Sequence, residues 1–157
     1  MDDDLRDRFR PPASDLPEPP GSGHGRFRIL PVVVSALLVD FGGTQIASMV
    51  IAFAGNAAAE RGVAPATIAS VYYWLANIIG ACFSALAGYV AARWSGARFL
   101  VHGAATAFVV LAINLPTFLT ALMGPNPAPV IVSYSAALPA ALLGAWFARR
   151  RAALLQS

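Results

Sequence analysis

Four long apolar runs alternate with short polar stretches along this chain. They cover approximately residues 29–54, 66–92, 99–123 and 129–148. Each has about 20 or more residues, so a helix over any of them would cross the roughly 30 Å of hydrocarbon in a bilayer. The runs lack the period-2 alternation of membrane β-strands and are too long for them. The pattern predicts an all-α integral membrane protein, a bundle of four transmembrane helices.

The breaks between the runs have the composition of turns. Residues 55–65, 94–96 and 124–127 contain glycine, and the first and third breaks also contain proline, which opposes helix continuation. Short breaks predict two helical hairpins. Residues 1–28 hold five prolines, mixed charges and few large apolar groups, so we expect a disordered tail. Residues 149–157 are expected to form a C-terminal tail.

Charge is scarce within the apolar region. The chain is 57% hydrophobic and 12% charged, against about 25% charged in a typical globular chain. Between residues 29 and 148 the charged side chains are Asp40, Glu60, Arg61, Arg93 and Arg98. Water would solvate such a surface poorly, whereas lipid needs no charge. The bilayer is therefore the first expected partner.

The arginines predict the orientation. All eleven basic residues are arginine, and ten lie in the N-terminal tail, the second break or the C-terminus, whereas Arg61 is on the other side. The positive-inside rule places both termini in the cytoplasm of a cell (inner) membrane protein. These arginines are scattered without interleaved aromatic residues, so we expect no nucleic-acid partner.

Catalytic and metal-binding motifs are missing from the sequence. It has no HExxH, GxSxG or phosphate-loop pattern. Cys82 lies alone in an apolar run, and His24 and His102 have no metal-site spacing. We therefore expect neither enzyme activity nor a cofactor or metal.

Asp40 is the main candidate for chemistry. An aspartate at a helix centre costs roughly 2.5–3.5 kcal/mol on insertion scales, so it must face the bundle, water or a partner chain. We expect Asn77, Asn114 or Gln45 as its partner, and a protonated carboxyl when no cation is bound. The adjacent Gly42 and Gly43 predict a kink or a short unwound turn. Helical spacing puts one small or polar face on this helix: Ala36, Asp40, Gly43, Thr44, Ala47 and Ser48.

The second helix carries a similar stripe. It consists of Ser70, Trp74, Asn77, Ala81, Ser84, Gly88 and Ala91. Small residues let helix backbones approach closely in a membrane. The opposite face is predicted to contact lipid, and comprises Tyr72, Leu75, Ile79, Phe83, Leu86 and Val90.

A depth count links the four helices. One polar residue in each lies 16 residues from the flanking arginine, which is about 24 Å along a helix. These residues are Thr44, Asn77, Asn114 and Ser133. They are predicted to form one polar layer, with Asp40 one turn closer to the cytoplasm. Interhelical hydrogen bonding and a ligand path would both explain such a layer.

A faint repeat relates the two hairpins. Residues 85–93 and 141–149 match at five positions with an offset of 56, which suggests parallel hairpin repeats. We expect first a non-enzymatic bundle or accessory subunit that packs with itself or with a membrane partner protein. The alternative is a small, oligomeric, proton- or cation-coupled transporter or channel that uses Asp40.

Overall fold

The computed structural model describes residues 27–124 and 127–155, and every element in them is helical. The first long helix, Ile29–Glu60, is continuous and has three parts: α2 (Ile29–Val34), the π-helix η1 (Ser35–Gly42) and α3 (Gly43–Glu60). It is followed by α4 (Pro65–Ser95), α5 (Phe99–Leu122) and α6 (Ala128–Leu154). The expectation of an all-helical chain with four helices long and apolar enough to span a membrane is confirmed. Most of the predicted N-terminal tail, residues 1–26, lies outside the described residues.

Two helices run further than the apolar runs predicted. The first continues past Ala54 to Glu60, and α6 continues past Ala148 through three arginines to Leu154. Hydropathy locates the part of a helix that suits hydrocarbon, but alanine and arginine are also strong helix formers. The chain therefore stays helical beyond its apolar stretch, and most of the predicted C-terminal tail belongs to α6.

Local chemistry sets the ends of α4. Pro65 occupies the first turn, where its missing N–H is not needed. At the other end Gly96 adopts a left-handed conformation, with φ of 68°, and its N–H donates to the Ala92 carbonyl. The Ser95 hydroxyl also donates to Ala92 O, at 2.8 Å. The turn before Pro65 joins α3 and α4 into a hairpin, and the turn at Gly96 leads from α4 into α5, which forms the second hairpin with α6.

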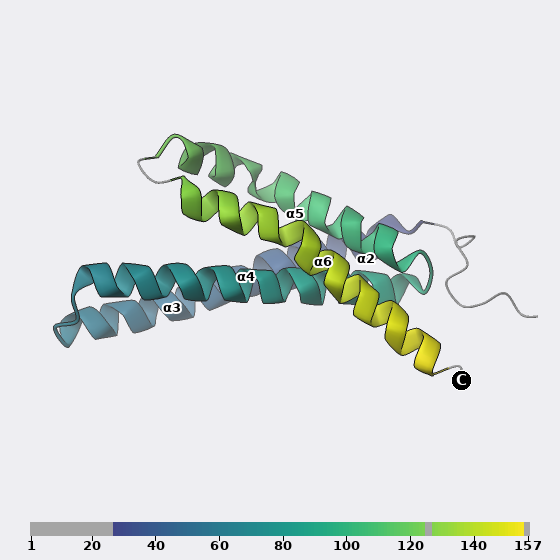
Figure 1. Cartoon of the computed structure of the whole chain (residues 1–157), viewed down its shortest axis with the longest axis horizontal. Coiled ribbons are helices and arrows are strands. Elements are labelled where there is room, and N and C mark those ends of the chain that lie inside the picture. Colours follow the sequence, from purple (N-terminus) through teal and green to yellow (C-terminus); the bar gives the residue numbers. More distant parts are fainter. Residues whose placement is uncertain (1–26, 125–126, 156–157) are drawn as a thin grey trace, which may run out of the picture.

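The hairpins are packed at one end and spread at the other. Figure 1 shows them close together where α6 crosses α4 and divergent toward the loops that join each hairpin. We call the packed end, which carries Arg28, Arg93, Arg98 and Arg149, the arginine end, and the other the far end. The buried residues of α4 begin at Ser84, whereas α3 has none. The core therefore lies at the arginine end.

The crossing of α4 and α6 is built from small residues. A side chain at Gly88 would collide with the Ala141 backbone, and one at Gly144 would collide with the Ala85 backbone. In the repeat with an offset of 56, Ala85 corresponds to Ala141 and Gly88 corresponds to Gly144. The contact of Gly88 with Ala141 is therefore equivalent to the contact of Gly144 with Ala85. The repeated segments are thus parallel partners across a local pseudo-two-fold axis.

Two side chains attach the first helix to the rest of the bundle. Phe83, predicted to contact lipid, instead lies where a side chain at Gly43 would be, so it packs α4 against the first helix. His102 on α5 is fully buried. Its Nε2 accepts a hydrogen bond from the Arg28 N–H at 3.0 Å, and its ring stacks on Phe27. Both contacts hold the first helix in the bundle.

Candidate functional site

Asp40 lies within a π-helix. The sequence predicted a kink or an unwound turn beside Gly42 and Gly43, and the structure instead has a wider helical turn that ends at Gly42. Such π segments occur often at functional sites. The backbone stays helical, and the Asp40 side chain is only 5% exposed.

The partner of Asp40 is Ser84 on α4. The buried Ser84 hydroxyl donates to Asp40 Oδ2 at 2.5 Å. The expected partners were wrong: Gln45 is exposed, and the amides of Asn77 and Asn114 donate to their own helices. The π-helix explains the error. It places more residues in each turn, so the chain climbs less per residue and Asp40 stays level with Ser84.

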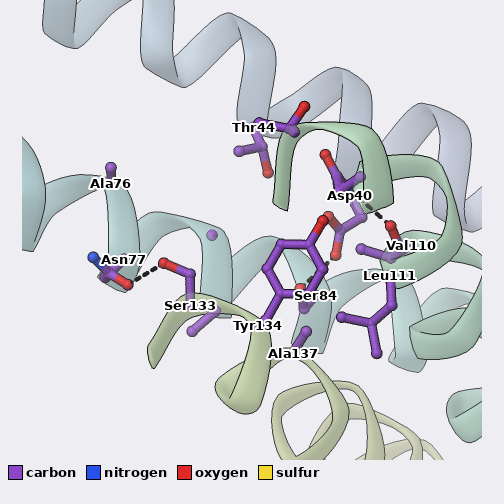
Figure 2. A pocket seen from close by; sticks show the side chains of 14 residues that line it. Asp40, Thr44, Ala76, Asn77, Ser84, Val110, Leu111, Ser133, Tyr134 and Ala137 are labelled. Carbon is purple, nitrogen blue, oxygen red and sulfur yellow. Dashed lines mark hydrogen bonds between the residues drawn. The ribbon is translucent and has the colours of Figure 1, made fainter. Parts of the chain in front are cut away.

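A cavity of 240 Å³ adjoins this pair. All four long helices line it, and it brings together the five residues singled out in the sequence: Asp40, Thr44, Asn77, Asn114 and Ser133. The remaining lining residues are Ala76, Gly80, Ala81, Ser84, Val110, Leu111, Thr117, Tyr134 and Ala137. Figure 2 shows Asp40 and Ser84 on one side of the Tyr134 ring, and Asn77 and Ser133 on the other.

Part of the polar layer is structural hydrogen bonding. The Ser133 hydroxyl donates to Asn77 Oδ1, which joins α6 to α4. The Asn77 amide donates to Tyr73 O at 2.8 Å, and the Asn114 amide donates to Val110 O at 2.9 Å. These amides are oriented by their own helices, so their donors do not point freely into the cavity.

Two other hydroxyl groups of the cavity are less well satisfied. The Thr44 hydroxyl is buried and has no hydrogen-bond partner among the described residues. The Tyr134 hydroxyl lies near the Phe118 backbone without a hydrogen bond of normal geometry, while its ring packs on the Phe118 ring at 4.1 Å. Buried polar groups are nearly always paired, so these two hydroxyl groups are available to hydrogen-bond a molecule that enters the cavity.

Sequence reasoning missed three polar lining residues as site members. Ser84 was placed on the stripe of α4 but was not matched to Asp40, because the depth count assumed uniform α-helix. Thr117 follows Asn114 by three residues, so helical spacing could have placed it on the same face. Tyr134 lies three residues before Ala137 and seven before Ala141. This helical spacing could have placed Tyr134 on the same face of its helix as these two small residues.

The chemistry available in the cavity is limited. Its described lining contains one carboxyl group and no arginine, lysine, histidine or cysteine. No three residues of the kinds that ligate metals gather anywhere in residues 27–124 and 127–155. Hydroxyl and amide groups make up the rest of the polar lining. This arrangement can bind a proton or a cation and can form hydrogen bonds.

Comparisons with known proteins add no identity to this geometry. No protein-family model, curated protein or solved structure matches the chain.

Proposed function

We propose that this chain is a non-enzymatic, multi-pass membrane protein that acts as a small transporter or channel, with Asp40 binding a proton or cation. One observation carries the proposal: a carboxyl group that is 5% exposed lies beside a 240 Å³ cavity at mid-helix depth. Ionisable groups inside a membrane are costly and usually mark ion or substrate pathways. A purely structural layer would need neither the charge nor the space.

The small-residue seams support this choice over an accessory subunit. Those seams first suggested packing with another chain. In the structure, however, Gly88 and Gly144 contact α6 and α4 of the same chain. The part of the seam around Gly88 and Gly144 is therefore satisfied internally and does not call for a partner. What it positions is the cavity, which begins about one turn from Gly88 at Ser84.

The packing also supports a direction of access. A cluster of buried side chains, comprising Ala92, Phe99, Ala145 and Ala148, closes the arginine end. The far end has little core because α3 buries none of its residues. With the arginine end in the cytoplasm, the cavity would be closed to the cytoplasm and reached from the opposite side or from between the hairpins.

An accessory subunit is the second candidate. The far half of the first helix favours it, because Met49, Val50 and Phe53 are strongly exposed and no residue of α3 is fully buried within the chain. A second copy or a membrane partner protein would cover this surface. A transporter of four helices also needs an oligomer, so both candidates require a contact between α3 and a second chain. They differ in whether Asp40 binds a proton or cation.

Flux in proteoliposomes separates the candidates. We expect Asp40→Asn to abolish pH- or cation-dependent flux, because the amide keeps the shape of the side chain and loses its charge. Asp40→Glu should retain part of the flux. Glu60→Gln is the matched control, since Glu60 is an exposed acid at the end of α3. Unchanged flux in folded Asp40→Asn would remove the transport proposal and leave the accessory subunit.

Reporter fusions test the orientation. Fusions after Gly62 and Asn126 should report outside, and fusions after Gly96 and Ser157 should report the cytoplasm. The first turn covers residues 61–64, because α3 ends at Glu60 and α4 begins at Pro65. An external signal at Ser157 would contradict the proposed topology.

A further inference from the structure

The cavity has open space beside Gly80. A side chain built at Gly80 would meet no atom within 4 Å. Gly80 and Ala81 lie on α4 between Asn77 and Ser84, which are seven residues or about 10 Å apart along the helix. Ala137 lines the same space from α6. Small side chains therefore leave room along α4, beside the Tyr134 ring that lies between the polar pairs Asp40–Ser84 and Asn77–Ser133 (Figure 2).

The charge of the lining defines the charge of a ligand. Asp40 is the one carboxyl group among the described lining residues, and none of them is basic. A buried carboxylate needs an opposite charge close by, so a ligand that pairs with it carries a single positive charge. The Ser84 hydroxyl already donates to Oδ2 and helps to orient the carboxylate.

The size and the walls define the rest of the ligand. An apolar cavity of about 150 Å³ accommodates benzene, so 240 Å³ holds a body of that size together with a charged group. Drug-sized ligands occupy roughly 300–1,000 Å³, which is more than this cavity offers. The walls near Asp40 include Val110, Leu111 and Ala137, whose side chains are hydrocarbon and would be poor partners for water.

The cavity is less suited to binding an alkali cation. It requires a shell of several oxygen ligands, but the oxygens of Asn77 and Ser133 are already hydrogen-bonded to each other. The Tyr134 ring lies between the polar pairs, and Val110, Leu111 and Ala137 line the space near Asp40, so the lining is not a closed ring of oxygens (Figure 2). A group that is charged at one end and apolar along its length fits both features.

We propose that the cavity binds a small amphipathic amine with a single positive charge. Its ammonium group pairs with Asp40, and its apolar body lies along Gly80, Ala81 and the Tyr134 ring. The Thr44 hydroxyl, buried without a partner, is available to the ammonium group or to a water beside it. This inference rests on the proposed cation-binding role of Asp40 and names the class of cation.

Calorimetry on the purified full-length protein in nanodiscs tests the inference with benzylammonium as the probe. Benzyl alcohol supplies the same body without charge, and sodium ion supplies charge without the body. We expect benzylammonium to bind more tightly than either. Asp40→Asn should weaken it by about tenfold or more, as expected for loss of a charge-assisted hydrogen bond. Gly80→Leu should weaken it by a similar factor because leucine fills the open space.

Ile78→Leu is the matched control, because it places the same side chain on the exposed face of α4, outside the cavity lining, and should leave binding unchanged. Size-exclusion chromatography checks that each variant is folded. If Gly80→Leu is not, Ala81→Leu adds the same bulk from the neighbouring position. Unchanged benzylammonium affinity in a folded bulky variant overturns the inference, and so does equal binding of benzyl alcohol.

The outcomes distinguish this inference from the function on which it rests. Asp40-dependent binding of sodium ion or proton, without binding of benzylammonium, overturns the amine and leaves the proposed transporter or channel intact. Absence of any Asp40-dependent binding and of any Asp40-dependent flux overturns both.

Discussion

At the scale of single residues, the setting of Asp40 depends on one hydroxyl from another helix. The carboxyl is buried, and Ser84 donates to it across the interface between η1 and α4. Such a bond has two roles, because it offsets part of the burial cost and fixes the direction of the remaining oxygen. The gain is modest in a membrane, where interhelical hydrogen bonds average roughly 0.6 kcal/mol.

Ser84→Ala tests this contact. We expect the variant to lose about 1 kcal/mol of stability, because the Asp40 carboxyl group stays buried but no longer accepts the hydrogen bond from Ser84. It should also weaken Asp40-dependent cation binding, since the carboxyl is no longer oriented. Ser70→Ala on the exposed part of the same helix is the control and should behave like the parent chain. Thermal unfolding in detergent and calorimetry measure the two effects, and equal behaviour of both variants would contradict a role for Ser84.

The residue types and their approximate depth could be predicted from the sequence. A lone acid in an apolar run, and polar residues at equal distance from flanking arginines, are sequence patterns that placed Asp40, Thr44 and Asn77 near one another. The pairing of Asp40 with Ser84 could not be predicted in this way. It depends on a π-helix, which changes the rise of the chain and has no clear signature beyond two adjacent glycines.

At the scale of elements, the crossing of α4 and α6 positions the cavity. Backbone approaches backbone at Gly88 and Gly144, so these helices are in closest contact at their crossing near the arginine end. The cavity starts where the contact ends. Its width therefore depends on how closely the two glycines let the helices approach.

Glycine substitutions at the helix crossing and in the cavity should have opposite results. Gly88→Ala and Gly144→Ala place a methyl group against the backbone of the partner helix, so each should cost at least about 1–3 kcal/mol. Gly80→Ala points into open space and should be neutral or stabilising by up to about 1 kcal/mol, because alanine favours a helix. Thermal melts of the three variants measure the difference. Equal melting temperatures would show that the helices do not approach at these glycines.

The four helices could be predicted from hydropathy, but the residues at which they end could not. Four apolar runs became four long helices, but the helix over residues 29–54 continues to Glu60 because alanines follow the apolar stretch. The repeat at an offset of 56 was a weak pattern in sequence. It gained meaning through the reciprocal contacts of Gly88 with Ala141 and of Gly144 with Ala85, which sequence alone cannot supply.

At the scale of the whole molecule, the two hairpins form a wedge-shaped arrangement with its core at the arginine end (Figure 1). The asymmetry of burial has a functional consequence. A site placed where the hairpins begin to separate is closed on one side by packing and approachable from the other. The Asp40 carboxyl group lies at this boundary. A movement of the two hairpins away from each other at the far end would therefore be enough to expose it.

Cysteine labelling tests this asymmetry in the intact bundle. The background is Cys82→Ala, because the native thiol is exposed on α4. Thr117→Cys, an exposed lining position on α5, should react to completion with a membrane-impermeant thiol reagent added from the far side. Ala145→Cys, in the fully buried cluster at the arginine end, should stay unlabelled under the same conditions because thiol reactivity requires access. Labelling of Thr117→Cys only from the arginine side would reverse the direction of access, and protection of Thr117→Cys by benzylammonium would connect that access to the amine site.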